Sequence, residues 1–326
     1  MEELPFMLVK EIGGPSGVVA EHEEFLKKHF RLITLKEFME DKTHFSERIT
    51  CIFGWGVKLK IDQELLQSLP NLKVIGVAGA GVDHLDLKMI STFGVKVTNT
   101  PQEVTSATAD LAMTLLLASA RDLLAGIQVA VSPDTETYPL NWMSDEVTGS
   151  TVGIIGMGGV GYKIAERARA FEMKILYHNR HRRKEEEERA VGATYCEKVE
   201  DLLEQSDYVI LAVTLTSETA NMIGKRAFEL MRPTATLINI SRGAVVDHNA
   251  LVEALQNGSI KAAALDVTFP EPLPRNHPLL KMKNVILTPH SGTATHHCRR
   301  RMMMKVVDNI LAVIHGQPIP NEVFQK

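Results

Sequence analysis

The chain has 326 residues, a formal net charge of −4 and a pI near 6.3, with 44% hydrophobic and 23% charged residues. This length predicts about two domains with ample cores, and the composition is typical of globular proteins. The slightly acidic balance excludes a global basic field for nucleic acid, and no run approaches ~18 uninterrupted apolar residues, so we expect neither nucleic acid nor membrane as a partner. The three cysteines (Cys51, Cys196 and Cys298) have no paired spacing, which predicts a reducing compartment, the cytoplasm.

Short apolar runs alternate with helical stretches along the chain. Most of these runs are continuous, as in parallel strands that are covered on both faces, and the alternation predicts an α/β fold with doubly wound parallel sheets. Ten strands exceed one usual domain, so we expect two sheets. The predicted strands occupy residues 6–10, 49–54, 72–79, 95–100, 151–156, 174–179, 208–213, 235–240, 261–267 and 284–289.

The predicted helices set the domain boundaries. A long helix near 103–123 precedes the polar stretch 131–149, which we expect to form an arm between domains. Asp247 and Gly258 predict the start and stop of a later helix. We expect the final helix, 294–315, to return to the first domain. The domains are then 1–102 with 293–326, and 103–292.

A glycine-rich turn follows the fifth predicted strand. Residues 151–161 have the sequence TVGIIGMGGVG, in which Gly156, Gly158 and Gly161 form a G-x-G-x-x-G before a helical stretch. Gly156 allows the turn, Gly158 lets a pyrophosphate approach the backbone, and Gly161 lets the helix pack close to the strand. The alternative is a glycine-rich surface turn, but the strand and helix context favours dinucleotide binding.

The segment after the next strand is basic where NAD-binding folds place an acidic residue. Asn179 and Arg180 occupy that position, and no acidic residue appears before Glu185. An acid repels a 2′-phosphate, whereas arginine binds it through charged hydrogen bonds. The sequence therefore favours NADP(H) over NAD(H), with Arg180 as the first candidate and His181, Arg182 and Arg183 as weaker partners. The alternative is a solvated basic loop balanced by the acidic run after it.

Three polar segments come after later strands. Arg242 lies in INISRGAVVD, Glu271 in LDVTFPEPLP and His290 in LTPHSGTAT. Loops at the carboxyl ends of parallel strands converge, so we expect these side chains to meet. Arginine holds a carboxylate in a two-pronged grip, histidine gives a proton to a carbonyl oxygen as hydride reaches its carbon, and a carboxylate orients the imidazole. The set predicts hydride transfer to a small acid, with Arg242, Glu271 and His290 as catalytic residues.

These motifs, together with VAGAGVDHLDL (77–87) and TADLAMTLLLASAR (108–121), are similar to those of a known family. The chain resembles the D-isomer-specific 2-hydroxyacid dehydrogenases, and among them most closely the glyoxylate/hydroxypyruvate reductases. The matching segments span residues 72–297, which is most of the chain. The resemblance implies a flavodoxin-like substrate domain and a Rossmann-like nucleotide domain that flank a cleft, and a homodimer.

The resemblance also implies roles for individual residues. Arg242 binds substrate, Glu271 partners the acid–base His290, and Asp266 meets the nicotinamide. The expected substrate-binding residues are Ala80, Gly81, Arg242, His290 and Thr293, and no metal ligand is expected. The expected cofactor-binding residues are Gly156, Gly158, Gly159, Val160, Gly161, Asn179, Arg180, Thr214, Ile240, Asp266 and Gly292.

One departure concerns the arm. Relatives often carry a tryptophan there that reaches the partner's active site, whereas spacing from the glycine turn places Asn141 at that position and Trp142 beside it. Trp55 is a second aromatic candidate for the cleft, and the alternative is a ring packed within its domain.

The predicted function is NADPH-dependent reduction of a small 2-oxo acid of the glyoxylate or hydroxypyruvate type to the D-2-hydroxy acid. The alternatives are reduction of a sugar-derived 2-keto acid, and a nucleotide-binding corepressor-like module without turnover.

Overall fold

The structure is a computed structural model that describes residues 3–14, 18, 20–55 and 59–324. The chain divides into two compact units, and each is described by itself. Unit 1 comprises Met1–Val104 and Ala294–Lys326, and unit 2 comprises Thr105–Thr293. The sequence-based boundaries lie two residues before the first break and one residue before the second.

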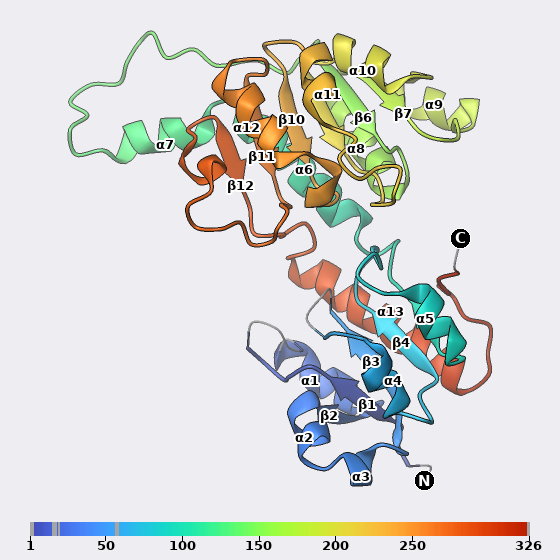
Figure 1. Cartoon of the computed structure of the whole chain (residues 1–326). Coiled ribbons are helices and arrows are strands. Elements are labelled where there is room, and N and C mark those ends of the chain that lie inside the picture. Colours follow the sequence, from blue (N-terminus) through green and yellow to red (C-terminus); the bar gives the residue numbers. More distant parts are fainter. Residues whose placement is uncertain (1–2, 15–17, 19, 56–58, 325–326) are drawn as a thin grey trace. The chain divides into compact units, whose positions relative to one another are not determined.

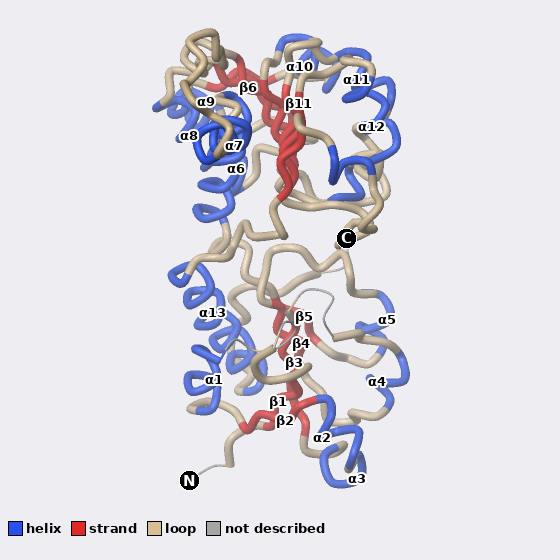
Figure 2. Tube along the Cα trace, turned by 90° about the vertical axis from the view of Figure 1, so that its left-hand side faces the viewer, coloured by secondary structure: helices blue, strands red, loops and turns tan. Residues whose placement is uncertain are grey.

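Unit 1 is built on a five-stranded parallel sheet with strand order β2-β1-β3-β4-β5 (Figure 1). Its helices lie on both faces of the sheet (Figure 2), and α13 returns from the end of the chain to pack on β4. The strands are β1 (Phe6–Val9), β2 (Arg31–Thr34), β3 (Ile49–Gly54), β4 (Val74–Val77) and β5 (Lys96–Thr98). The helices are α1 (Ala20–Lys27), α2 (Leu35–Glu40), α3 (Lys42–Phe45), α4 (Gln63–Gln67), α5 (Leu87–Thr92) and α13 (His296–Ile314).

Unit 2 is built on a seven-stranded parallel sheet with strand order β12-β11-β10-β9-β6-β7-β8. Helices again cover both faces of the sheet (Figure 2), and each face has its own hydrophobic cluster. The strands are β6 (Thr151–Ile155), β7 (Lys174–His178), β8 (Ala193–Tyr195), β9 (Tyr208–Leu211), β10 (Thr236–Asn239), β11 (Ala262–Leu265) and β12 (Val285–Leu287). The helices are α6 (Thr105–Ala120), α7 (Leu123–Val131), α8 (Gly159–Ala170), α9 (Glu185–Val191), α10 (Val199–Gln205), α11 (Lys225–Leu230) and α12 (His248–Gln256), with 3-10 turns η2 (Gly243–Val245) and η3 (Pro278–Lys281).

The two parallel sheets confirm the predicted α/β class, but two strands and one helix break were missed. β2 and β8 are short and lie at the sheet edges, where most of their residues stay partly exposed, so they lack a continuous apolar run. The predicted helix near 103–123 ends at Ala120, because Asp122 adopts a left-handed φ of 46° and α7 starts afresh. In the described part of the chain no single helix is long and apolar enough to cross a membrane. Among the described helices, α6 and α7 reach that length and composition only as a pair, across a 61° bend.

The glycine turn joins β6 to α8 through two close backbone approaches. Gly156 has a φ of +96°, and a Cβ there would lie 2.7 Å from the Ala212 carbonyl carbon. A Cβ on Gly161 would lie 2.3 Å from the Gly156 carbonyl oxygen. These positions admit only glycine without backbone movement, so the turn geometry and the start of α8 depend on both.

Gly161→Ala should destabilise the protein by about 1–3 kcal/mol, because the added methyl group meets a backbone oxygen that no rotamer change can move. Urea unfolding measures the difference. The control is Gly224→Ala, where the nearest atom to a Cβ, the Asn221 carbonyl oxygen, is 3.5 Å away and the backbone is extended. Equal unfolding midpoints for the two variants would show that α8 does not pack closely against β6.

Candidate functional site

Three neighbouring strands of unit 2 deliver the predicted catalytic residues to one edge of the sheet. β10, β11 and β12 are adjacent and parallel. Arg242 follows the carboxyl end of β10, Asp266 directly follows β11, and His290 follows β12. Glu271 lies in the loop that continues from β11. Because parallel strands end at the same edge, the fold places all four at one site of unit 2.

The closest contact in this group joins His290 to Glu271. The imidazole Nδ1 lies 2.7 Å from the Glu271 Oε1, and both side chains are about half exposed. A carboxylate only accepts hydrogen bonds, so Nδ1 carries a proton and Nε2 is left for another partner. Glu271 also accepts a hydrogen bond from the Thr268 N–H at 3.3 Å, through its other oxygen. This pair has the geometry of an imidazole oriented by a carboxylate.

The site's electrostatics favour an ionised Glu271. Burial alone raises the pKa of this carboxyl. The hydrogen bond and charge of His290, the Thr268 N–H and the positive charge of Arg242 outweigh burial, and the pKa of Glu271 is lowered. Arg242 therefore acts electrostatically on the same carboxylate that orients the imidazole.

The backbone at Arg242 is held by the end of its own strand. Asn239 is fully buried, and its amide donates a hydrogen bond to the Arg242 carbonyl oxygen at 2.9 Å. The amide oxygen of Asn239 accepts from the N–H and hydroxyl of Ser241. The guanidinium Nη1 of Arg242 donates to the Ser241 carbonyl oxygen at 2.9 Å. Sequence reasoning missed Asn239, although a polar residue in the apolar run ATLINI is a signal for such a role.

Asp266 holds the loop that carries His290. Its side chain accepts hydrogen bonds from the Thr288 hydroxyl (2.7 Å), the Ser291 N–H (2.7 Å) and the Gly292 N–H (2.9 Å), and the residue is only 2% exposed. The Asp266 carbonyl oxygen accepts from the His290 N–H, and His290 itself has a left-handed φ of 52°. Such a conformation persists in a non-glycine residue only when its surroundings fix it. The structure thus gives Asp266 a supporting role that the sequence did not indicate.

The loops after β10 and β11 touch at Gly243. A Cβ at this position would lie 2.0 Å from the Thr268 carbonyl carbon and 2.5 Å from the Phe269 nitrogen. Only glycine allows this backbone contact, which sets the Arg242 loop against the Glu271 loop. In the sequence, the only sign of this contact is that Gly243 directly follows Arg242.

The glycine turn has the features that a dinucleotide requires. α8 begins at Gly159 directly after the turn, and a Cβ on Gly158 would meet nothing within 4 Å, so this side of the backbone is open. The Asn179 side chain accepts from the Met157 N–H at 2.6 Å and donates to its carbonyl oxygen at 3.2 Å. These residues fit the pyrophosphate of a nicotinamide dinucleotide, with Asn179 bracing the turn.

The remaining predicted cofactor residues differ in their surroundings. Val160 lies in the first turn of α8, and Ile240 is buried after β10. Thr214 is exposed, and its carbonyl oxygen accepts from the Thr219 hydroxyl. Gly292 is buried and bonded to Asp266, and Thr293 is the last residue of unit 2.

The arginines of the basic segment after β7 differ in how tightly glutamates hold them. Arg182 forms two hydrogen bonds to Glu188 and holds the pKa of that carboxyl at about 2, against the effect of burial. Arg183 pairs with Glu187 and donates to the Met157 carbonyl oxygen. Arg180 has a side chain that is 68% exposed and lies 3.7 Å from Glu218. Arg182 and Arg183 are thus held by hydrogen bonds to glutamates of α9, and Arg180 and His181 are better placed for a ligand phosphate.

The predicted carboxylate-binding turn lies in unit 1 after β4. The Gly79 N–H donates to the Thr100 hydroxyl at 2.9 Å, and the Asn99 amide donates to the Ala80 carbonyl oxygen at 2.7 Å. Ala80 is exposed and Gly81 partly exposed. In the same unit, the Arg299 guanidinium lies 5.4 Å from the ring centroid of Trp55.

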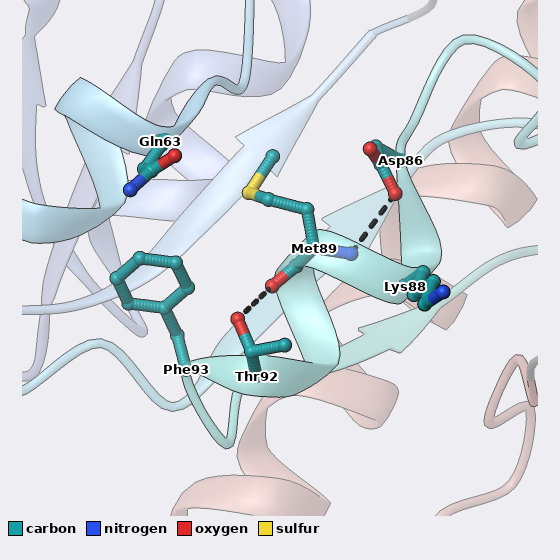
Figure 3. A pocket seen from close by; sticks show the side chains of 6 residues that line it. All are labelled: Gln63, Asp86, Lys88, Met89, Thr92 and Phe93. Carbon is teal, nitrogen blue, oxygen red and sulfur yellow. Dashed lines mark hydrogen bonds between the residues drawn. The ribbon is translucent and has the colours of Figure 1, made fainter.

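A separate hollow of about 330 Å³ lies beside α5 of unit 1 (Figure 3). Its six lining side chains include none of the predicted site residues, and its hydrogen bonds are local, from the Met89 N–H to Asp86 and from the Thr92 hydroxyl to the Met89 carbonyl oxygen. Within residues 3–14, 18, 20–55 and 59–324, no cluster of three His, Cys, Asp or Glu residues could hold a metal ion.

Known proteins are similar to this chain in both sequence and fold. Residues 113–292 match the family described as D-isomer specific 2-hydroxyacid dehydrogenase, NAD binding domain. A glyoxylate reductase of Thermococcus litoralis is 45% identical over 269 residues, which cover 81% of this chain and 80% of that protein. A glyoxylate/hydroxypyruvate reductase B of an Enterobacter species is 39% identical over 89% of this chain and 90% of that protein.

A solved structure extends this likeness over nearly the whole chain. It is an NADPH-dependent glyoxylate/hydroxypyruvate reductase from Sinorhizobium meliloti in complex with NADP and malonate. The TM-score is 0.85 at 31% identity, covering 98% of this chain and 97% of that one. The chain therefore belongs to the D-isomer specific 2-hydroxyacid dehydrogenase family, and it is an oxidoreductase that uses a nicotinamide cofactor.

The pKa of the Glu271 carboxyl should be lower than that of a free glutamate, because His290, the Thr268 N–H and Arg242 outweigh burial. Because its pKa is lowered in the folded state, the stabilising effect of the His290 contact is present above the ordinary pKa and is lost as the pH falls through the lowered one. Carbon-13 NMR of the side-chain carboxyl measures the pKa of Glu271. In His290→Ala the Glu271 pKa should rise, since burial remains while its strongest partner is gone.

Glu187 provides the control for that titration. Its pKa is lowered chiefly by the hydrogen bond from Arg183, and it should not respond to His290→Ala. An unchanged Glu271 titration in the variant would contradict the pairing of Glu271 with His290.

Proposed function

We propose that the protein reduces a small 2-oxo acid of the glyoxylate or hydroxypyruvate type to the D-2-hydroxy acid with NADPH, and that His290 is the general acid. The observation that carries the proposal is the 2.7 Å contact between His290 and Glu271, formed where the charge of Arg242 also acts. A proton donor, a carboxylate that orients it and a cation are the groups that carbonyl reduction of an acid requires.

Each residue of the site has a distinct part in this chemistry. The bound cofactor supplies hydride to C2 of the 2-oxo acid. The His290 Nε2 donates a proton to the oxygen on C2, while Nδ1–H stays bonded to Glu271, which stabilises the imidazolium before transfer. Arg242 binds the substrate carboxylate and carbonyl through its guanidinium. The Asp266 carboxylate holds the His290 loop, and Asp266 would be among the residues at the nicotinamide end of the bound cofactor.

The substrate class is supported by the names of relatives. The Thermococcus litoralis protein is a glyoxylate reductase, and the Enterobacter protein is a glyoxylate/hydroxypyruvate reductase. A panel of 2-oxo acids that includes glyoxylate, hydroxypyruvate and a sugar-derived 2-keto acid tests the ranking through NADPH oxidation.

His290→Ala should lower turnover by about 10²- to 10⁴-fold, the usual loss when a general acid is removed. Cofactor affinity, measured by fluorescence titration with NADPH, should stay close to that of the native protein. The exposed His315, which lies just beyond the end of α13, provides the control as His315→Ala. Near-normal turnover of His290→Ala would refute the assignment.

The preference for NADPH rests on the exposed part of the basic segment. Arg180 and His181 are exposed after β7, whereas Arg182 and Arg183 are engaged by glutamates of α9. A 2′-phosphate carries about two negative charges, so a nearby guanidinium stabilises it through charged hydrogen bonds. One solved relative is described as NADPH-dependent and was solved with NADP.

Arg180→Ala should raise the KM for NADPH by roughly 10- to 100-fold, as for loss of charged hydrogen bonds, and leave the KM for NADH nearly unchanged. The matched control is Arg189→Ala, another exposed arginine, which pairs with Glu185 on α9. A native enzyme that prefers NADH would overturn the role of Arg180.

We also propose that the protein is a homodimer in the cytoplasm. α7 exposes four apolar side chains, Leu123, Leu124, Ile127 and Val131, and the following arm exposes Tyr138, Leu140 and Met143. A surface with so many exposed apolar groups is typical of a protein interface. The Trp142 ring lies close to Gly126 of α7, and Asn141 is exposed. The three cysteines are all free and buried, which suits a reducing compartment.

A further inference from the structure

A buried histidine outside the predicted catalytic set connects the loops that carry Arg242 and Glu271. His248 opens α12, directly after the N-cap Asp247, and is only 9% exposed. Its Nδ1 lies 3.0 Å from the Val246 carbonyl oxygen, and its Nε2 accepts from the Phe269 N–H at 3.3 Å. Val246 ends the turn after Arg242, and Phe269 lies two residues before Glu271.

The partners of His248 determine its protonation. A carbonyl oxygen only accepts, so Nδ1 must donate, and a backbone N–H only donates, so Nε2 must accept. Both contacts together require the neutral imidazole with its proton on Nδ1. Burial, and then the neighbouring His277, lower the pKa of His248 against the opposing effects of the Val246 carbonyl and Asp247. The environment thus keeps the form that the two hydrogen bonds need.

The contact with Phe269 matters because Phe269 lies at the base of the loop that carries Glu271. Within this loop, the Thr268 N–H donates to the Glu271 carboxylate, and the Thr268 hydroxyl donates to the Pro270 carbonyl oxygen. The backbone beside Phe269 already lies against Gly243 of the Arg242 loop. His248 therefore fixes the base of the loop whose tip holds the Glu271 carboxylate against His290.

We propose that His248 is a positioning residue of the 2-oxo acid reductase site, which acts by holding the Phe269 N–H and, through it, Glu271. The inference rests on the proposed function for its kinetic consequence, but its geometric consequence is independent of turnover. Without the Nε2 acceptor, the partly buried Phe269 N–H loses its partner, and the loop shifts to find another. Misplacement of a catalytic group by about 1 Å costs up to about 10²-fold in rate.

The variants His248→Asn and His248→Gln test the roles of the two ring nitrogens separately. An asparagine amide reaches the place of Nδ1 and keeps the contact with the Val246 carbonyl oxygen, whereas a glutamine amide reaches the place of Nε2 and offers an acceptor to Phe269. His248→Gln should therefore retain most activity. His248→Asn and His248→Phe should lose roughly 10- to 100-fold in kcat, with little change in the KM for NADPH. Asn249→Ala alters the next, exposed residue of α12 and should match the native protein.

The titration of Glu271 provides the second measurement on the same variants. In His248→Asn the carboxyl should drift from His290, and its pKa should rise relative to the native protein and to His248→Gln. Circular dichroism shows whether each variant is folded. If His248→Phe does not fold, the comparison of His248→Asn with His248→Gln still tests the role of His248. Equal kcat values and equal Glu271 titrations in the Asn and Gln variants would overturn the proposal. If the native protein reduced no 2-oxo acid, the proposed function would fail, and the titration alone would still decide the role of His248.

Discussion

The buried carboxylate of Asp266 is the interaction on which the site of unit 2 depends. It accepts hydrogen bonds from two backbone N–H groups and two hydroxyls of the segment 288–292, and the backbone carbonyl oxygen of Asp266 accepts from the His290 N–H. A carboxylate that is almost fully buried is stable only when its acceptor capacity is filled, and here the donors come from the His290 loop itself. The same bonds fix His290 in a left-handed conformation that an unsupported histidine rarely adopts.

The convergence of Arg242, Glu271 and His290 could be predicted because residue chemistry and strand order coincide in the sequence. Arg242 and His290 follow apolar runs that are typical of buried parallel strands, and Glu271 lies in the loop after a third. The glycine spacing likewise implied the turn before α8. In each case a local pattern favoured one structure, and the carboxyl ends of the parallel strands brought the residues together.

The remaining features depend on contacts between segments far apart in the sequence. Nothing local to Asp266 shows that it accepts from residues more than twenty positions later, and nothing local to His248 shows that it meets Phe269. The edge strands β2 and β8 lack the apolar run of a covered strand, so sequence periodicity does not reveal them. The break at Asp122 was missed because helix-forming residues continue on both sides of a single left-handed residue. Among the four basic side chains after β7, only the folded structure distinguishes Arg182 and Arg183, which hydrogen-bond to glutamates of α9, from Arg180, which does not.

The order of the strands explains how the site stays together. β11 lies between β10 and β12, and its loop touches both neighbours. Asp266 holds the segment after β12, while the backbone at Thr268 packs on Gly243 after β10, and Glu271 then contacts His290. The central loop thus sets the positions of the cation and of the imidazole with respect to one carboxylate. Each of these contacts uses a different part of that loop, so a displacement at its base would also move Glu271 at its tip. The buried imidazole of His248, at the start of α12, contacts the base of the loop and therefore affects the position of Glu271.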